Sequence, residues 1–314
     1  MQKFTSFFDV PDYKKLLQKA LEIKQNPFDF QMFGKNKTIG LLFLNPSLRT
    51  RLSSVKAAYN LGANVWVLNA GADSWQLEMS DGTIMDGNSQ EHIKEAIQVM
   101  NQYCDILGVR TFPCLTDKQK DYSEEVMNKI LQNCTKPYIS LESATLHPLQ
   151  TFADLITIEE HKTKPKPKVV LTWAPHPKAL PQAVPNSFAE WFSNINEVDF
   201  VITHPIGYEL DIKFTQNTPI IYDQNEALQN ADFVYAKNWS SYSEYGKILS
   251  QDKSWIIDKN KMQHTDNGKF MHCLPVRRNV IVTDEVLDSE NSLVIHQANN
   301  RTFSAQTIFH EMLK

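Results

Sequence analysis

The chain has 314 residues and a formal net charge of -4, and its 42% hydrophobic content is typical of a globular protein. This length allows two domains of ordinary size, and the acidic balance excludes a general surface for nucleic acid. No apolar run approaches the roughly 18 residues of a membrane span, and the first residues lack the apolar core of a signal peptide. We therefore expect a cytoplasmic protein that binds neither nucleic acid nor membrane.

Predicted helices and predicted strands alternate along the first half of the chain. Apolar spacing predicts helices over residues 10–24, 48–61, 91–103 and about 122–133, and short apolar runs predict strands over 38–44, 63–68, 105–110 and 137–141. A helix between two apolar strands implies a right-handed parallel βαβ unit. The polar loop over residues 70–90 is long enough to suggest a functional segment. These elements predict a first α/β domain over residues 1–145.

The second half repeats the alternation. A helix is predicted from Pro148 to about residue 162, and further strands over 169–172, 200–203, 233–236 and 270–272. The segments 163–168 and 175–181 are rich in proline and are predicted to be irregular. A last helix over 302–313 is expected to pack back on the first domain. The predicted fold class is α/β, with a second domain over 146–314, each domain being a mainly parallel sheet flanked by helices.

Ligands of open α/β sheets bind beyond the carboxyl ends of the strands, and here those ends are strongly cationic. They carry the segment 47–51, Arg110, His147, the segment 173–178, Lys237 and the segment 272–278. Local positive charge in an acidic protein indicates a small anionic ligand. Glycine-rich phosphate loops and zinc-ligand spacing are both absent from the sequence, so no nucleotide cofactor and no metal are expected. The four cysteines show no disulfide spacing, which fits a reducing compartment.

The segment 47–51 lies where a predicted strand leads into a predicted helix. A helix N-terminus carries unpaired N–H groups and about half a positive charge, which suits an oxyanion. Ser47 and Thr50 add hydroxyl donors, while Arg49 and Arg51 add fixed positive charge. Taken alone, the turn is better explained as an ordinary serine cap beside two solvated arginines, and only the rest of the chain favours the anion site.

Three signatures together resemble those of the aspartate/ornithine carbamoyltransferase superfamily, in its order and over the whole chain. They are Ser47-Leu48-Arg49-Thr50-Arg51, then His147-Pro148-Leu149-Gln150 with Ala153-Asp154, and His272-Cys273-Leu274-Pro275. The resemblance implies that carbamoyl phosphate is bound by Ser47, Leu48, Arg49, Thr50, Trp75, Arg110, His147, Gln150, Cys273, Leu274 and Arg301. It also implies a homotrimer whose active sites lie between subunits, with Trp75 supplied by the neighbour. Trp75 packed on its own domain is the alternative.

The implied reaction needs no covalent intermediate. A neutral amine attacks the carbonyl carbon, and donors already in place stabilise the tetrahedral oxyanion before phosphate departs. The residues with implied catalytic roles are Arg49, Thr50, Arg110, His147 and Cys273. Cys273 and the leaving phosphate are both possible proton acceptors. A nucleophilic Cys273 is disfavoured because strand neighbours His272 and Cys273 point to opposite faces.

Sequence motifs in the predicted second domain indicate which amine accepts the carbamoyl group. The Asp-x-x-x-Ser-Met-Gly motif of ornithine carbamoyltransferases is absent, and the comparable segment 235–239 holds Lys237, which would oppose a free α-ammonium. The segments 173–178, 237–239 and 274–279 resemble the N-acylornithine branch, whose second domain is knotted. The acylated amino acid is then expected to contact Gln90, Glu142, His176, Lys237, Arg277 and Arg278. Glu142 is alternatively a simple surface carboxylate.

One loop position in this branch selects the acyl group, being glutamate for acetyl and proline for succinyl enzymes. Here it is Gln90, which matches neither pattern but lacks the charge that would repel a succinyl carboxylate. The sequence therefore favours transfer to the δ-amine of N-succinyl-L-ornithine in arginine biosynthesis. The alternatives are an N-acetylornithine enzyme, a plain ornithine or aspartate carbamoyltransferase, a reverse reaction that degrades citrulline-like compounds, and a non-catalytic anion-binding relative.

Overall fold

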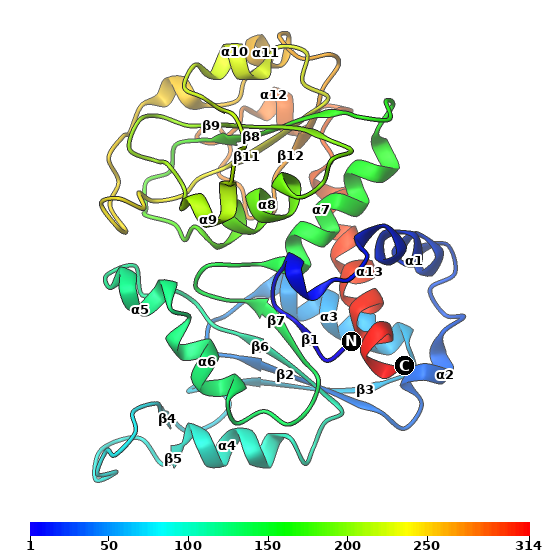
Figure 1. Ribbon diagram of the computed structural model, residues 1–314, viewed down its shortest axis with the longest axis vertical. Helices are drawn as coiled ribbons and strands as arrows, with labels where there is room; N and C mark the ends of the chain where they lie inside the picture. The colour runs from blue at the N-terminus through cyan, green and yellow to red at the C-terminus, as the bar shows by residue number, and fades with distance from the viewer. The chain divides into compact units, whose positions relative to one another are not determined.

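A computed structural model describes residues 1–314, and the chain forms two compact units (Figure 1). Unit 1 comprises Met1–Phe152 and Arg301–Lys314, and unit 2 comprises Ala153–Asn300. The chain passes from one unit to the other inside two helices, α7 (Pro148–His161) and α13 (Val294–Leu313). The first division thus falls seven residues after the predicted boundary at 145, and α13 begins eight residues before the predicted start at 302.

Unit 1 is built on a five-stranded sheet in which every pairing is parallel. Its strand order is β1-β7-β6-β2-β3, with β1 at Lys3–Phe4, β2 at Thr38–Phe43, β3 at Asn64–Asn69, β6 at Ile106–Arg110 and β7 at Tyr138–Glu142. The four strands predicted for this half are confirmed. Strand β1 was missed because two residues are too short to show a period.

Helices cover both faces of this sheet (Figure 1). They are α1 (Tyr13–Gln25), α2 (Gln31–Gly34), α3 (Leu48–Asn60), α4 (Ile93–Met100), α5 (Lys118–Tyr122) and α6 (Glu125–Leu131), with a 3-10 turn at Phe7–Asp9. Helices α4 and α6 pack on one face through a cluster that includes Ile97 and Ile130, and α1, α3 and the end of α13 lie on the other. All strands being parallel, their carboxyl ends share one edge of the sheet.

Two predicted helices differ from the structure for identifiable reasons. The helix predicted over 122–133 corresponds to α6, which begins only at Glu125, because Glu124 before it adopts a left-handed backbone with φ of 54°; α5, which ends at Tyr122, was not predicted. The helix predicted from residue 91 begins at Ile93, since Glu91–His92 forms β5 and pairs with β4 (Leu77–Glu78) in the 70–90 loop. Both differences arise from local conformations that apolar spacing does not encode.

Helix α3 buries small and polar side chains. Leu52 and Tyr59, which mark the apolar spacing in the sequence, are 59% and 61% exposed. The buried positions include Thr50 and Ser54, and Asn60 donates a hydrogen bond of 2.9 Å to Gln306 of α13. The buried face of α3 is therefore formed by small and polar side chains, and large apolar side chains of this helix are exposed.

Unit 2 holds a second five-stranded sheet, again with parallel pairings. Its order is β10-β9-β8-β11-β12, with β8 at Lys168–Trp173, β9 at Asp199–Thr203, β10 at Ile220–Ile221, β11 at Phe233–Lys237 and β12 at Lys269–Met271. Its shorter elements are α8 (Ala183–Ser193), α9 (Ile212–Thr215), α10 (Gln224–Leu228), α11 (Lys259–Met262), α12 (Asp284–Leu287) and a 3-10 turn at Lys253–Trp255. The predicted two-domain α/β class is confirmed; the knot stays a prediction.

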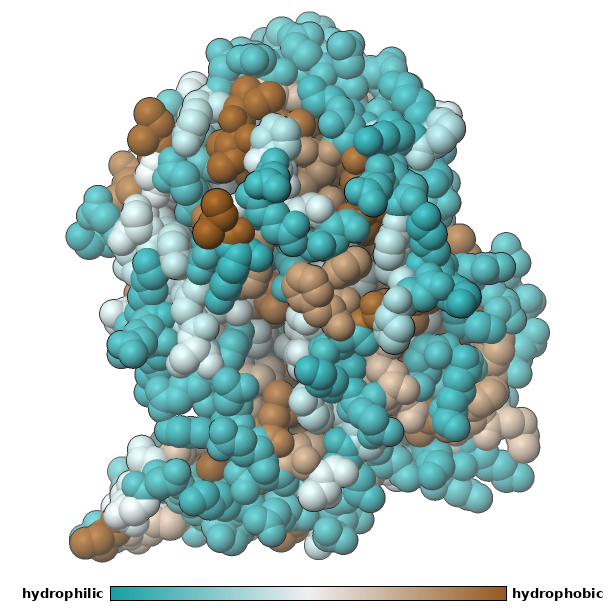
Figure 2. All heavy atoms as spheres, in the orientation of Figure 1, coloured by the Kyte–Doolittle hydropathy of each residue, from teal (hydrophilic) through white to brown (hydrophobic).

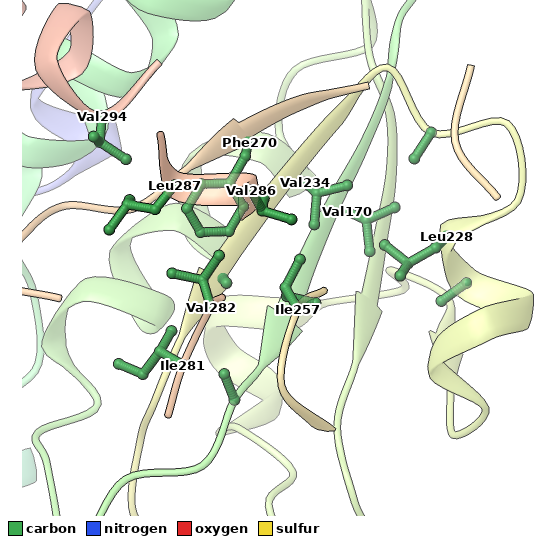
Figure 3. Packing of buried hydrophobic residues seen from close by; sticks show 14 of the residues in the cluster. Val170, Leu228, Val234, Ile257, Phe270, Ile281, Val282, Val286, Leu287 and Val294 are labelled. Atoms are coloured by element: carbon green, nitrogen blue, oxygen red, sulfur yellow. The ribbon is translucent and has the colours of Figure 1, made fainter. Parts of the chain in front are cut away.

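The hydrophobic core of unit 2 holds the ends of its central strands side by side. Val170, Val234 and Phe270 come from three neighbouring strands and pack with Ile257 and Val282 (Figure 3). Burying each such side chain contributes about 2 kcal/mol. Together with the ladder hydrogen bonds, this packing holds the carboxyl ends of β8, β11 and β12 next to one another.

The surface is mostly polar on the face drawn in Figure 2. None of the helices combines the length and apolarity that crossing a bilayer requires. The 70–90 loop ends in hydrophobic surface at the lower left of Figure 2, and Ile84 in this loop is 81% exposed. Its tip therefore presents apolar area to the surroundings.

Gly40 of β2 faces Trp66 of β3, and a side chain there would destabilise unit 1. An added Cβ would lie 2.2 Å from the Trp66 ring, which is held by a hydrogen bond of 2.9 Å from its indole nitrogen to the carbonyl of Tyr103. We expect Gly40→Ala to lower the free energy of unfolding by about 2 kcal/mol, the usual cost of overpacking. Urea unfolding of this variant checks it, with Gly87→Ala as the control because a Cβ there meets nothing. Equal stability of the two variants would contradict the prediction.

Candidate active site

The site in unit 1 starts at the N-terminus of α3. Strand β2 ends at Phe43, and Ser47 occupies the N-cap position with an extended backbone, yet its hydroxyl makes no capping hydrogen bond. The ordinary serine cap considered from the sequence is therefore not formed. The first N–H groups of a 13-residue helix, with Ser47 beside them, are arranged to receive an anion.

Arg301 joins three segments that are distant in sequence. This arginine of α13 is 7% exposed, and its guanidinium donates to the amide oxygen of Gln150 and, at 2.5 Å, to the hydroxyl of Thr50. Gln150 lies in the first turn of α7 and Thr50 in the first turn of α3. One buried cation thus holds the starts of two helices together.

Arg110 and Glu142 form a buried ion pair at the ends of β6 and β7. The Arg110 guanidinium donates to the Glu142 carboxylate at 2.5 Å and to the carbonyl of Pro46 at 3.0 Å. The pairing of the two strands skips Leu141, so that Glu142 lies opposite Arg110. Such an irregularity re-aims a side chain at a strand end. Arg110 is thereby brought to the turn that precedes α3.

His147, just before α7, lies next to this pair. Its Nε2 is 3.8 Å from the Glu142 carboxylate, its ring is 3% exposed, and its Nδ1 has no hydrogen-bond partner. Burial, followed by the charges of Arg301 and Arg110, holds the pKa of His147 well below its usual value. The imidazole is therefore neutral at pH 7, with one N–H available to donate.

Unit 1 therefore gathers most of the residues that were expected to bind carbamoyl phosphate. Those linked by hydrogen bonds or lying beside one another are Thr50, Arg110, Glu142, His147, Gln150 and Arg301, with Ser47, Leu48 and Arg49 at the start of α3. Glu142, assigned from the sequence to the acylated amino acid, is paired with Arg110 of this group. The carbonyl of Pro46 was missed, because backbone oxygens leave no pattern in a sequence.

A second cationic group lies at the strand ends of unit 2. The Arg277 guanidinium donates to Nε2 of His176 at 3.1 Å, while Nδ1 of that ring lies 2.9 Å from the carbonyl and 3.0 Å from the backbone N–H of Lys178. Burial is the main reason why the pKa of His176 lies below its usual value. The nearby positive charges lower this pKa further; they belong to Lys237, Arg277 and Lys178. Lys237 is 9% exposed, and no carboxylate pairs with its ammonium or with Arg277.

Cys273 follows β12 in unit 2 and is 8% exposed. The hydroxyl of Tyr235 lies beside the Asp154 carboxyl and the Cys273 thiol, and burial chiefly raises the pKa of Tyr235 well above its usual value. Gln297 connects Asp154, at 2.7 Å, to the backbone N–H of His272, at 3.0 Å. Tyr235 could have been found from the sequence, since it lies two residues before Lys237 on the same strand.

Leu274, the residue after Cys273, has a left-handed backbone with φ of 56°, which is uncommon for a non-glycine residue. Arg278 was expected to contact the acylated amino acid. It is 48% exposed, and its guanidinium is paired with Asp284 at 2.7 Å and Asp288 at 2.6 Å. These carboxylates compete with any ligand carboxylate, so its role stays a prediction.

Trp75 and Gln90 lie in unit 1, in the long loop that follows β3. The indole of Trp75 donates to the Glu91 carboxylate at 2.8 Å, and the ring is 50% exposed. Both residues line a cavity of about 970 Å³, whose walls also include Trp66 and Tyr103. Trp75 is thus anchored to its own loop while keeping half of its surface exposed. Across the chain, no group of three or more His, Cys, Asp or Glu side chains could hold a metal ion.

Family models match nearly all of the chain. The carbamoyl-P binding domain of aspartate/ornithine carbamoyltransferase matches residues 3–160, and the Asp/Orn binding domain of the same family matches residues 183–312. An N-succinylornithine carbamoyltransferase of Bacteroides fragilis is 53% identical, over 100% of this chain and 99% of that protein. An N-acetylornithine carbamoyltransferase of Xanthomonas campestris pv. campestris is 38% identical, over 91% and 89%.

Solved structures agree with this assignment. Acetylornithine transcarbamylase complexed with acetylcitrulline has a TM-score of 0.91 and 34% identity, over 99% of both chains. A glutamate-to-alanine variant of such an enzyme, complexed with carbamyl phosphate and N-succinyl-L-norvaline, has the same TM-score and identity, over 99% of this chain and 100% of that one. The fold and the sequence therefore point to one family.

His147 should make stability depend on pH in acid. Its pKa is lowered in the folded chain, so below the unfolded value of 6.5 the unfolded chain binds a proton that the folded chain does not. Stability is then lost as pH falls below 6.5. We expect His147→Asn to flatten this part of the profile, measured by urea unfolding between pH 7 and pH 5. Exposed His296→Asn is the control, and an unchanged slope in His147→Asn would contradict the prediction.

Proposed function

Because the chain belongs to the aspartate/ornithine carbamoyltransferase family, we propose that it transfers the carbamoyl group of carbamoyl phosphate to the δ-amine of N-succinyl-L-ornithine. The products are N-succinyl-L-citrulline and phosphate, in arginine biosynthesis. The observation that carries the choice of acceptor is the group of Lys237, Arg277 and His176, in which cations have no carboxylate among them. Such a group repels a free α-ammonium and attracts the carboxylates of an N-acylated amino acid.

Carbamoyl phosphate binds, in this proposal, to the group in unit 1. Its phosphate is held by the N-terminus of α3, with Ser47, Leu48, Arg49 and Thr50, and by the guanidinium of Arg110. Arg301 and Gln150 already share a hydrogen bond and hold the carbamoyl end together with Thr50. Positive charge that is fixed before binding needs no reorganisation when phosphate leaves.

The transfer step uses neutral His147 and the Arg110–Glu142 pair. His147 donates its N–H to the carbamoyl oxygen, and because its pKa is lowered the ring does not compete as a base at pH 7. Glu142, between Arg110 and His147, orients the attacking δ-amine. Either Cys273 or the leaving phosphate accepts the proton.

Succinyl is the acyl group that several observations favour. The relative from Bacteroides fragilis at 53% identity is an N-succinylornithine carbamoyltransferase, against 38% for the N-acetylornithine enzyme. Gln90 lacks the charge that would oppose a succinyl carboxylate. The variant structure that holds N-succinyl-L-norvaline has likewise lost a glutamate. The N-acetylornithine reaction remains the second candidate because solved structures of that enzyme share this fold over the whole chain.

The proposal includes a homotrimer in which Trp75 completes the site of a neighbouring subunit. The half-exposed ring of Trp75 and the exposed Ile84 in the same loop support a contact with a second copy. Apolar area on a protruding loop is a common mark of an interface. A cytoplasmic location and the biosynthetic direction belong to the same proposal.

The acceptor assay tests the proposed function directly. Purified protein receives carbamoyl phosphate with N-succinyl-L-ornithine, N-acetyl-L-ornithine, L-ornithine or L-aspartate, and the ureido product is measured. We expect kcat/KM for the succinyl acceptor to exceed that for the acetyl acceptor by about tenfold or more, with no product from the free amino acids. A higher kcat/KM for the acetyl acceptor would reassign the substrate. Absence of product from every acceptor would reject the transferase.

A Gln90→Glu variant tests the selection of the acyl group. The new carboxylate repels a succinyl carboxylate, so the succinyl-to-acetyl ratio of kcat/KM should fall about tenfold, which corresponds to about 1.4 kcal/mol. Gln98→Glu, which adds the same charge on the exposed face of α4, is the matched control and should leave the ratio unchanged. An unaltered ratio in Gln90→Glu would remove this residue from the selection of the acyl group.

A further inference from the structure

Glu124 makes a concentrated set of hydrogen bonds with one short segment of unit 1. Its carboxylate accepts from the Ser143 hydroxyl at 2.6 Å, the Ala144 N–H at 3.2 Å, and the Thr145 N–H and hydroxyl at 2.8 and 2.5 Å. Both carboxylate oxygens take part. Four donors converging on one carboxylate are far more than a surface glutamate ordinarily collects.

The backbone of Glu124 is adapted to this contact. Its φ of 54° places it in the left-handed region, which is costly for a residue with a side chain. Asp121, in the preceding helix α5, has a similar role: its carboxylate accepts from the N–H groups of Cys114 and Leu115 at 2.9 Å each. The carboxylates of Asp121 and Glu124 therefore hold two loops, one that follows β6 and one that follows β7.

The segment that Glu124 holds connects two members of the candidate site. It begins directly after Glu142, at the end of β7, and ends at His147, before the first turn of α7. Ser143 further ties it through hydrogen bonds between its own N–H and the carbonyl of Leu146, at 2.8 Å, and between the Leu146 N–H and its hydroxyl, at 3.1 Å. The path of this turn sets the 3.8 Å spacing between the His147 ring and Glu142.

We propose that Glu124 is a positioning residue for the carbamoyl transfer, which holds the turn from Ser143 to Leu146 so that His147 faces the reacting carbonyl. The inference rests on the proposed function and deepens it. Glu124 touches no substrate and acts through the turn. Its effect is therefore expected in the transition state, where the placement of the His147 donor matters most, more than in the binding of either substrate.

Glu124→Gln is the main test variant, because the amide keeps the shape of the side chain but replaces an accepting oxygen with a donor. We expect kcat with N-succinyl-L-ornithine to fall by about tenfold to a hundredfold, with KM for both substrates within about threefold. In protein labelled with ¹⁵N-histidine, the ring resonances of His147, assigned through His147→Asn, should shift. Glu125→Gln is the matched control on the next residue, where Lys129 is the partner, and should change neither quantity.

A second variant keeps the inference testable if Glu124→Gln does not fold. Thr145→Val removes only one of the four hydrogen bonds, and we expect a fall in kcat of about threefold together with shifted His147 resonances. A folded Glu124→Gln protein with unchanged kcat and unchanged His147 resonances would overturn the inference. If Glu124→Gln is unfolded, unchanged kcat and unchanged His147 resonances in Thr145→Val would overturn it. If the wild-type protein carbamoylates no acceptor, the proposed function fails, whereas the His147 resonances still decide whether Glu124 positions this ring.

Discussion

The buried guanidinium of Arg301 is the contact on which the candidate site of unit 1 depends. It donates to Thr50, 251 residues earlier in the chain, and to Gln150 at the start of α7. A cation removed from water needs hydrogen-bond acceptors, and here two side chains from separate helices accept from Nη1 and Nη2 of the guanidinium. The same end of α13 adds a hydrogen bond of 2.8 Å from the hydroxyl of Ser304 to the carbonyl of Leu149. The last helix is therefore part of the site's framework.

Both cationic groups contain a histidine that stays neutral. Burial lowers the pKa of His147 and of His176, and nearby arginine or lysine charges lower it further. Each ring is therefore a neutral hydrogen-bonding group that lies among positively charged side chains. Donors arranged in advance of the reaction are the main means by which enzymes stabilise developing negative charge. Glu142 is the one carboxylate paired within the unit 1 group, and its pairing with Arg110 places it at the end of β7.

Helices α7 and α13 carry residues for both units. In unit 1 they supply Gln150 and Arg301, and in unit 2 they supply Asp154 and Gln297, which contact each other at 2.7 Å. Gln297 in turn accepts from the backbone N–H of His272, next to Cys273. One part of each helix thus supplies a hydrogen-bonding side chain to the candidate site of unit 1, and the other part supplies one to unit 2, next to Cys273.

The sequence by itself determined the α/β class, the parallel strands of both halves and the cationic strand ends, because alternation of apolar runs is a local property. It also indicated the family through three short signatures. Tertiary structure alone decided that the pairing of β6 and β7 skips a residue and so places Glu142 against Arg110. It also decided that the helix predicted over 122–133 begins only after Glu124 and that this carboxylate reaches the turn before His147. These outcomes depend on hydrogen bonds between segments far apart in the chain, and no local pattern of residues encodes such partners.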